Sequence, residues 1–423
     1  MKTLIYGGHL VDPSQKIDGK RDILLENGVV KAVAEHIAED AEIKIDAAGK
    51  VIMPGFIDLH VHLREPGYEY KETIVTGGNA AAKGGVTTIC PMPNTNPVID
   101  SPERVTDLLE RAQQASVHIL PVGAVTLGQE GKELADIAGM KQAGAVALSE
   151  DGKSVMDSLL FRKGLAEAVK NHMPMFSHCE DKSLVDGGVM NAGLKAEDLG
   201  LPGITNAVED VIAARDIFMA KETGCRLHLC HCSTADSAVL VEMAKKQGLP
   251  VTGEVCPHHF TLADEDITED HGRFKMNPPL RGRKDVEALK KALSDGIMDI
   301  ISTDHAPHGA EEKNQTMKNA PFGIVGLETS FAISYTELVK AGYLTLSELV
   351  EKMSTNPAKV IGISKGTLTP GSAADLVIAD INTEYTIDST EFLSKGKNTP
   401  FDGKKVYGII EKTFVDGKLV YEK

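Results

Sequence analysis

Two histidines separated by one residue, His60 and His62, stand at the end of an apolar run that begins at residue 51. Side chains two positions apart on a strand project to the same side, so both imidazoles can reach one point. Later apolar segments also end in a histidine or an aspartate, namely 145–151, 173–178, 226–231 and 297–304. Imidazole and carboxylate groups that converge are typical ligands of Zn²⁺, with Mn²⁺, Co²⁺ or iron as weaker candidates. A lone His-x-His pair is weak evidence, but its repetition at further strand ends indicates a metal centre.

The order of the elements decides whether these side chains can meet. Eight apolar runs alternate with helix-like segments: 51–62, 86–94, 117–126, 144–151, 173–180, 225–233, 249–258 and 298–305. Between them, apolar residues recur at helical spacing in segments 102–115, 159–171, 207–223, 235–247 and 285–294. This alternation predicts an α/β fold built on a (β/α)8 TIM-type barrel, in which reactive groups lie at the carboxyl ends of the strands. All six candidate ligands fall there: His60, His62, Asp151, His178, His231 and Asp304.

Both ends of the chain have a different pattern from the middle. Short alternating strands are expected at 3–6, 22–26, 28–33 and 42–46, and again at 374–379 and 404–412, with a hairpin around Asp416-Gly417. We therefore expect one composite β-sandwich made from residues 1–52 and 366–423, flanking a catalytic barrel of residues 53–365. The alternative is two separate sheet fragments.

Composition limits the classes of partner and the compartment. The formal charge of −16 disfavours nucleic acid and anionic membranes as partners, because both require clustered Lys and Arg. The six cysteines show no repeated disulfide spacing, so free thiols in a reducing cytoplasm are the expectation. We see no signal peptide at the N-terminus and no apolar run of the roughly 20 residues that a membrane span needs.

Four histidines and two aspartates are more ligands than one hydrolytic zinc requires. A binuclear site bridged by a carboxylate and a hydroxide would use all six. Asp151 is the natural bridge, because two oxygens on one short stem can each face a metal ion. A metal ion also lowers the pKa of bound water, so such a hydroxide can attack a carbonyl near neutral pH. Taken singly, His178 or His231 would read as an ordinary histidine at the end of a strand.

Several longer motifs resemble those of the dihydroorotases, within the amidohydrolase superfamily. The segments Gly-Phe-Ile-Asp-Leu-His-Val-His-Leu-Arg-Glu-Pro-Gly at 55–67 and Ser-Thr-Asp-His-Ala-Pro-His at 302–308 carry most of this resemblance. Segments 91–95, 147–152, 177–181, 231–233 and 275–281 also match, in the same order along the chain. The resemblance covers essentially the whole chain. It implies a zinc-dependent cyclic amide hydrolase that interconverts N-carbamoyl-L-aspartate and (S)-dihydroorotate in de novo pyrimidine biosynthesis.

The resemblance also assigns roles to residues. It implies that His60, His62 and Asp304 hold one zinc ion, that His178 and His231 hold a second, and that Asp151 bridges them. Asp304 would also be the general acid and base. Many relatives in the superfamily bridge with a carboxylated lysine, but no strand-end residue here is Lys, as in the long-chain bacterial branch. The residues expected to bind substrate are His62, Arg64, Asn94, Asn277, His308, Phe322 and Gly323.

Other features leave alternatives open. A hydantoinase or allantoinase would use the same barrel and metals, although Arg64 with Asn94 favours a substrate that carries a carboxylate. A catalytically inactive dihydroorotase-like scaffold is a second alternative, but all six ligands are retained. The polar segment 309–315 has the composition of a mobile lid, and His258 and His259 could line the pocket. A homodimer is expected, and an association with aspartate carbamoyltransferase stays open.

Overall fold

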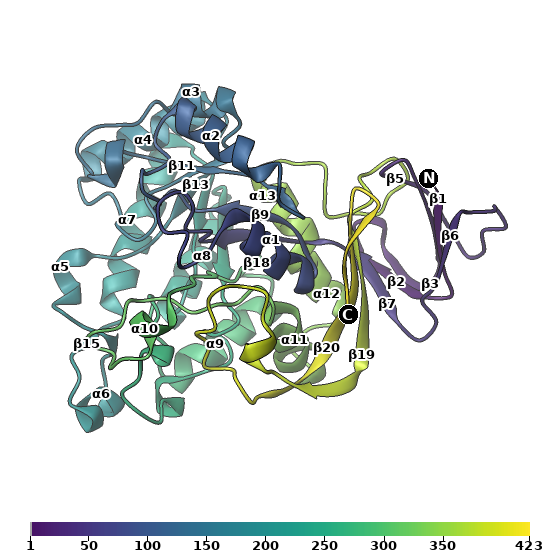
Figure 1. Cartoon of the computed structure of the whole chain (residues 1–423). Helices are drawn as coiled ribbons and strands as arrows, with labels where there is room; N and C mark the ends of the chain where they lie inside the picture. Colours follow the sequence, from purple (N-terminus) through teal and green to yellow (C-terminus); the bar gives the residue numbers. More distant parts are fainter. Residues whose placement is uncertain (1) are drawn as a thin grey trace.

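The computed structural model describes residues 2–423 and shows a mixed α/β protein. Figure 1 separates a large region of helices and parallel strands from a smaller β-rich region that contains both chain termini. Among the described residues, no helix is long and apolar enough to cross a bilayer. All six cysteines are buried and free.

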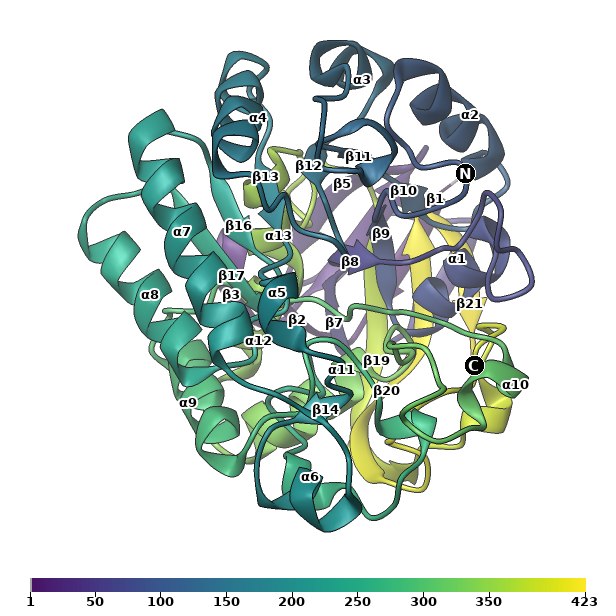
Figure 2. The ribbon, with the colours of Figure 1, turned by 90° about the vertical axis from the view of Figure 1, so that its left-hand side faces the viewer.

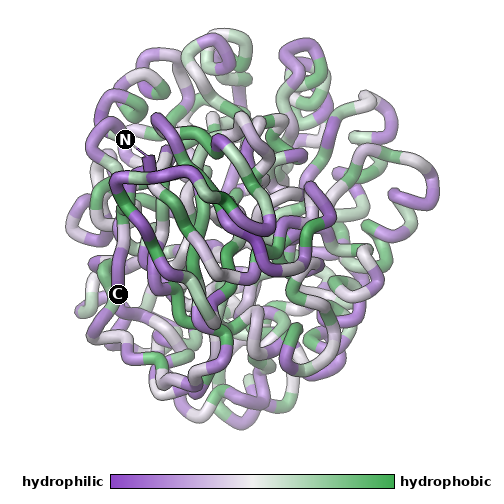
Figure 3. The backbone as a smooth tube through the Cα atoms, turned by 90° about the vertical axis from the view of Figure 1, so that its right-hand side faces the viewer, coloured by the Kyte–Doolittle hydropathy of each residue, from purple (hydrophilic) through white to green (hydrophobic). Residues whose placement is uncertain are grey.

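Strands from both ends of the chain build the β-rich region. One sheet has the order β5 (Val29–Ala34), β4 (Asp22–Glu26), β1 (Lys2–Tyr6) and β6 (Ile43–Asp46). The other has the order β21 (Lys418–Glu422), β20 (Lys405–Val415), β19 (Leu376–Thr386), β7 (Val51–Pro54), β2 (His9–Asp12) and β3 (Ile17–Lys20). A shared core that includes Ile5, Leu10, Ile23 and Phe414 packs between them. In Figure 3, which faces this region, hydrophobic and hydrophilic stretches alternate along the strands, as expected for sheets with one buried face.

The parallel strands of the large region form two hydrogen-bonded groups. The first has the order β10 (His118–Ile119), β9 (Val86–Pro91) and β8 (Phe56–Val61). The second has the order β11 (Val122–Ala124), β12 (Ala147–Ser149), β13 (Met175–Ser177), β16 (Leu227–Leu229), β17 (Val251–Val255) and β18 (Ile300–Ile301). Two links connect the groups: β10 and β11 lie on one stretch of chain interrupted by Pro121, and Val61 pairs in parallel with His305.

Helices surround these strands, as Figure 2 shows. The main ones are α1 (Ile74–Lys83), α2 (Pro102–Ala112), α3 (Ile137–Ala143), α4 (Ser158–Lys170), α7 (Ala207–Thr223), α8 (Ala235–Lys246), α9 (Arg283–Ser294) and α13 (Asn356–Ile361). Shorter elements are α5 (Lys182–Val185), β14 (Met190–Asn191), α6 (Leu194–Leu199), β15 (Gly203–Ile204), α10 (Ala310–Lys313), α11 (Ser330–Ser334) and α12 (Leu346–Val350). Local sequence fixes several helix ends: the side chains of Asp157 and Thr234 cap α4 and α8, and Gly224 ends α7 in the left-handed conformation.

The expected elements are present, with differences at their edges. The helix expected at 207–223 has those bounds, but the run 51–62 splits at Gly55 into β7, which joins the terminal sheet, and β8. The expected boundary at residue 52 therefore falls inside β7. The run 117–126 is broken because Pro121 lacks the N–H that a continuous ladder needs. Residues 404–412 and the first arm of the hairpin form one strand, β20.

Candidate active site

The six predicted ligands lie together, with the carboxylate of Asp151 at their centre. Asp151 Oδ1 lies 3.2 Å from His60 Nε2, 3.4 Å from His178 Nδ1 and 3.8 Å from His231 Nε2. The other oxygen, Oδ2, lies 3.6 Å from His62 Nε2. Two groups of potential metal ligands therefore share Asp151: one contains His60 and His62, and the other contains His178 and His231.

Asp304 completes the group on the side of the first pair. Its Oδ1 lies 3.0 Å from His62 Nε2 and 3.6 Å from His60 Nε2. The backbones of Asp304 and His231 have φ values of 48° and 34°, in the left-handed region that residues other than glycine rarely adopt. Strain of this kind persists only where surrounding structure enforces it and is frequent at functional sites.

Parallel strands explain why residues far apart in sequence converge. His60 lies in β8, and the other five follow the carboxyl ends of β8, β12, β13, β16 and β18 by one to three residues. The backbone N–H of His62 donates to the carbonyl of His305 at 2.8 Å, which holds the first ligand pair beside the segment that carries Asp304. The carboxyl ends of strands from both groups thus position the whole set.

Some donor atoms of the group bond one another, as His178 Nδ1 and His231 Nε2 do at 2.8 Å, but others have no partner. His60 Nε2 and Asp151 Oδ1 are buried and form no hydrogen bond with the described residues, although both point into the group. Burial raises the pKa of Asp151, but His60, His178 and His231 outweigh it and hold that pKa well below the ordinary value. An ionised carboxylate surrounded by imidazole nitrogens is a donor set that suits zinc.

The local field at His178 also favours a cation. Burial alone lowers the pKa of this imidazole, but the carboxylates of Asp151 and Glu180 outweigh burial and raise it to about 10. The same negative potential that favours a proton on the ring favours a divalent ion in its place.

Glu254 contacts two of the predicted ligands, His60 and His231, and also His228. Its Oε1 lies 3.0 Å from His60 Nδ1 and accepts the backbone N–H of His231 at 3.2 Å, and its Oε2 lies 3.0 Å from His228 Nε2. A carboxylate that accepts from the far nitrogen of a ligating histidine fixes the tautomer and orientation of that ring. Glu254 was not predicted from the sequence, where the only signal was an acid inside the apolar run 249–258.

A second carboxylate ties two ligand segments together. Asp58 is buried in β8, and its side chain accepts the backbone N–H groups of His60 at 3.1 Å and Thr303 at 3.2 Å. These bonds join the strand that carries His60 to the residue before Asp304. Asp58 lies inside the motif 55–67 but was not singled out from the sequence.

A cavity of about 180 Å³ opens onto five of the six predicted ligands, all except His60. Of the residues predicted to bind substrate, all but His308 line it: His62, Arg64, Asn94, Asn277, Phe322 and Gly323. Asn94 also contacts the ligands directly, because its Oδ1 lies 2.9 Å from His62 Nδ1 and its Nδ2 donates to Asp151 at 3.3 Å. Asn277 donates to Glu180 at 2.7 Å.

Arg64 reaches this cavity without a carboxylate partner. Its Nε donates to the carbonyl of Pro307 at 3.1 Å, and among residues 2–423 it forms no ion pair. His308 lies against it, with Nε2 at 3.2 Å from Arg64 Nη2, and does not line the cavity. A guanidinium that is open toward a small cavity can bind an anionic group by two parallel hydrogen bonds.

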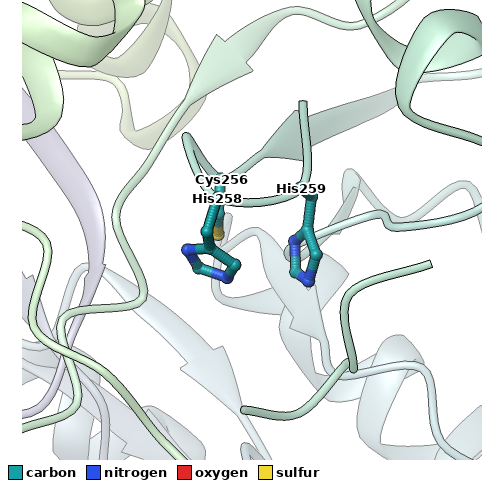
Figure 4. Close-up of side chains that lie close together, drawn as sticks. All are labelled: Cys256, His258 and His259. Atoms are coloured by element: carbon teal, nitrogen blue, oxygen red, sulfur yellow. The ribbon is translucent and has the colours of Figure 1, made fainter. Parts of the chain in front are cut away.

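Another set of potential ligands lies just beyond β17. Cys256, His258 and His259 are buried, and Figure 4 shows the three side chains close together. His259 Nε2 lies 3.0 Å from the carbonyl of Pro278. None of the three is among the residues that line the cavity, although the sequence suggested that His258 and His259 could line it.

Similar proteins place this site in a family. A family model described as "Dihydro-orotase-like" matches residues 49–237. A dihydroorotase of Elusimicrobium minutum is 49% identical over 425 residues, which cover 100% of this chain and 98% of that protein. A dihydroorotase of Syntrophus aciditrophicus is 47% identical over 427 residues, with 100% of both chains covered. The chain therefore belongs to the dihydroorotase family.

Other cyclic amide hydrolases share the fold of this dihydroorotase-family chain. The solved structure of the L-hydantoinase (dihydropyrimidinase) from Arthrobacter aurescens has a TM-score of 0.91 at 29% identity, covering 100% of this chain and 96% of that one. The resemblance inferred from the motifs is thus confirmed. Family membership and the two groups that share Asp151 together indicate a metal cofactor.

Proposed function

We propose that this enzyme catalyses the reversible cyclisation of N-carbamoyl-L-aspartate to (S)-dihydroorotate and water in de novo pyrimidine biosynthesis. The observation that carries the proposal is Arg64, which has no carboxylate partner among the described residues and lines the same cavity as five of the six predicted ligands. Both compounds carry a carboxylate that takes no part in the bond that forms or breaks and is therefore free to pair with Arg64. A hydantoin or allantoin ring gives Arg64 no such partner.

We propose two Zn²⁺ ions per subunit. His60, His62 and Asp304 would hold one, His178 and His231 would hold the other, and Asp151 would contact both. The support is the position of Asp151, whose two oxygens face different members of the set. When bound, the ions would polarise the amide carbonyl and supply an activated water at neutral pH.

Asp304 is the proposed proton carrier. Burial raises the pKa of its carboxyl, but the hydrogen bond with His62 and the nearby His60 outweigh burial and keep the pKa below its ordinary value. The ionised group can take a proton from the attacking water as the C–O bond forms. It then returns that proton to the ring nitrogen as the C–N bond breaks. Cyclisation uses the same steps in reverse.

The remaining cavity residues would orient the substrate. Arg64 would pair with the carboxylate, and the amides of Asn94 and Asn277 would add single hydrogen bonds. The backbone of Phe322 and Gly323 would hold the edge of the pyrimidine ring. In the structure both amides bond to carboxylates of the site, so they are already oriented toward its interior.

The proposal also covers the barrel, the domain boundaries, the partners and the location of the protein. We infer that the two groups of parallel strands close into a (β/α)8 barrel, since Val61 pairs with His305 and only Leu120 and Pro121 separate β10 from β11. Residues 1–52 and 366–423 would form the composite sandwich and residues 53–365 the catalytic domain. A homodimer, an association with aspartate carbamoyltransferase and a cytoplasmic location remain predictions, the last supported by six free thiols.

Substrate comparison tests the function. Purified, zinc-loaded enzyme should hydrolyse dihydroorotate with a kcat/KM at least about a hundredfold above that for hydantoin or allantoin, because only dihydroorotate forms the charge-assisted pair with Arg64. Arg64→Met should remove most of this preference. Faster turnover of hydantoin than of dihydroorotate by the wild type would contradict the proposal.

A further inference from the structure

The side chain of Lys71 contacts the segment that carries His308 and Glu312. Its Nζ lies 3.2 Å from His308 Nδ1 and 3.0 Å from Glu312 Oε1, and only 14% of the side chain is exposed. Tyr70 OH also donates to Glu312 at 3.0 Å, which fixes that carboxylate. Lys71 is therefore held in place beside the imidazole of His308.

Hydrogen bonding selects one tautomer of His308. A lysine ammonium only donates, so the ring nitrogen that faces Lys71, Nδ1, must be the acceptor. The other nitrogen, Nε2, then carries the hydrogen and donates to the carbonyl of Phe322 at 2.8 Å. Burial, followed by the charges of Arg64 and Lys71, lowers the pKa of His308 to about 2, which keeps the ring neutral.

This tautomer has a consequence for Arg64. Its Nη2 lies 3.2 Å from His308 Nε2, but an Nε2 that carries a hydrogen cannot accept from the guanidinium. The Nη2 hydrogens of Arg64 therefore stay available to the cavity. In the opposite tautomer, Nε2 would accept from Arg64 and occupy that donor.

We propose that Lys71 is a positioning residue that fixes the tautomer of His308 and thereby leaves Arg64 Nη2 open for the substrate carboxylate. The inference rests on the proposed function, because it requires Arg64 to bind that group. Without Lys71, Nδ1 would face Glu312 Oε2, which lies 3.8 Å away and can only accept. Moving the hydrogen to Nδ1 would cost the neutral bond from Nε2 to the carbonyl of Phe322, but Nε2 would gain a charge-assisted bond from Arg64 Nη2, so this tautomer would be favoured and that donor of Arg64 would be occupied.

Lys71→Met tests this role. We expect KM for dihydroorotate to rise about tenfold with kcat within about twofold of wild type, because one charge-assisted bond to the substrate is lost. Lys71→Arg keeps a donor and should restore most of the affinity. Lys395→Met is the matched control, since Lys395 is exposed, donates to the carbonyl of Glu69 and does not contact His308.

A spectroscopic measurement separates this role from a structural one. In ¹⁵N-histidine-labelled enzyme, long-range ¹H–¹⁵N spectra should show His308 with the hydrogen on Nε2 in wild type and on Nδ1 in Lys71→Met. The resonance is identified by its loss in His308→Asn. If the wild type turns over dihydroorotate but Lys71→Met keeps the wild-type tautomer and KM, the role of Lys71 is overturned and the proposed function is not. Absence of dihydroorotate turnover in the zinc-loaded wild type would instead contradict the proposed function.

Discussion

Replacing Glu254 by glutamine should weaken zinc binding, although it changes none of the six proposed ligands. Burial raises the pKa of this carboxyl, but the hydrogen bonds from His228 and His60 outweigh it and hold the pKa well below its ordinary value. Glu254 is therefore an anion that faces His60 Nδ1 at 3.0 Å. Glutamine keeps the shape and one acceptor oxygen but removes the charge.

The expected magnitude follows from these contacts. The amide oxygen can still accept from His60, and His228 can move its hydrogen to Nδ1, which lies 2.8 Å from the hydroxyl of Thr252. The main effect is thus that a neutral hydrogen bond replaces a charge-assisted one, which costs about 1–1.5 kcal/mol. This corresponds to about a tenfold weaker zinc affinity, at the lower end of what loss of such a supporting carboxylate costs.

Competition with a coloured chelator measures that affinity directly. Glu72→Gln is the matched control, because Glu72 is a fully buried acid 3.4 Å from His305 Nε2 and contacts none of the six ligands. The control should keep wild-type zinc affinity even if it unfolds at a lower temperature. A zinc affinity of Glu254→Gln within twofold of wild type would refute the idea that Glu254 supports His60 as a ligand.

Three further predictions follow from the site and its surroundings. Asp304→Ala should abolish turnover with an unchanged circular dichroism spectrum, and wild-type rates in zinc-replete buffer would end its role as proton carrier. Arg64→Met should raise KM for dihydroorotate by about 10- to 100-fold, the cost of a charge-assisted pair; an unchanged KM would remove Arg64 from substrate binding. Burial raises the pKa of Asp210 to about 6, above the unfolded value of about 3.9, so the folded state binds the extra proton between these values. Asp210→Asn should therefore be more stable than wild type in thermal unfolding at pH 7.5, with the difference shrinking as the pH falls from 6 to 4; a difference that stays constant with pH would contradict this reasoning.

Residue type and strand position were sufficient to predict which side chains converge. His60, Asp151 and His231 are separated by up to 171 positions in the chain, yet each follows or ends an apolar run, and parallel strands bring such ends to one edge. The distances around Asp151 agree with its predicted position between two groups of ligands.

Supporting residues were harder to predict because their role depends on contacts between strands. Glu254 and Asp58 each lie within apolar runs, where an acid gives no sign of which histidine or backbone N–H it meets. His308 lies 3.2 Å from Arg64 Nη2 and is not among the residues that line the cavity, an arrangement that the path of the loop decides; its contact with substrate stays a prediction. The split at Gly55 also depends on pairing with β19, which comes more than 300 residues later.

We propose that six residues hold two zinc ions and that turnover requires these ions. The most direct measurement is zinc content per chain during stepwise removal by a chelator, with dihydroorotate hydrolysis assayed on the same samples. We expect two zinc equivalents in the active enzyme, loss of turnover as they are removed, and recovery when zinc is returned. Full turnover by protein shown to contain no metal would contradict it.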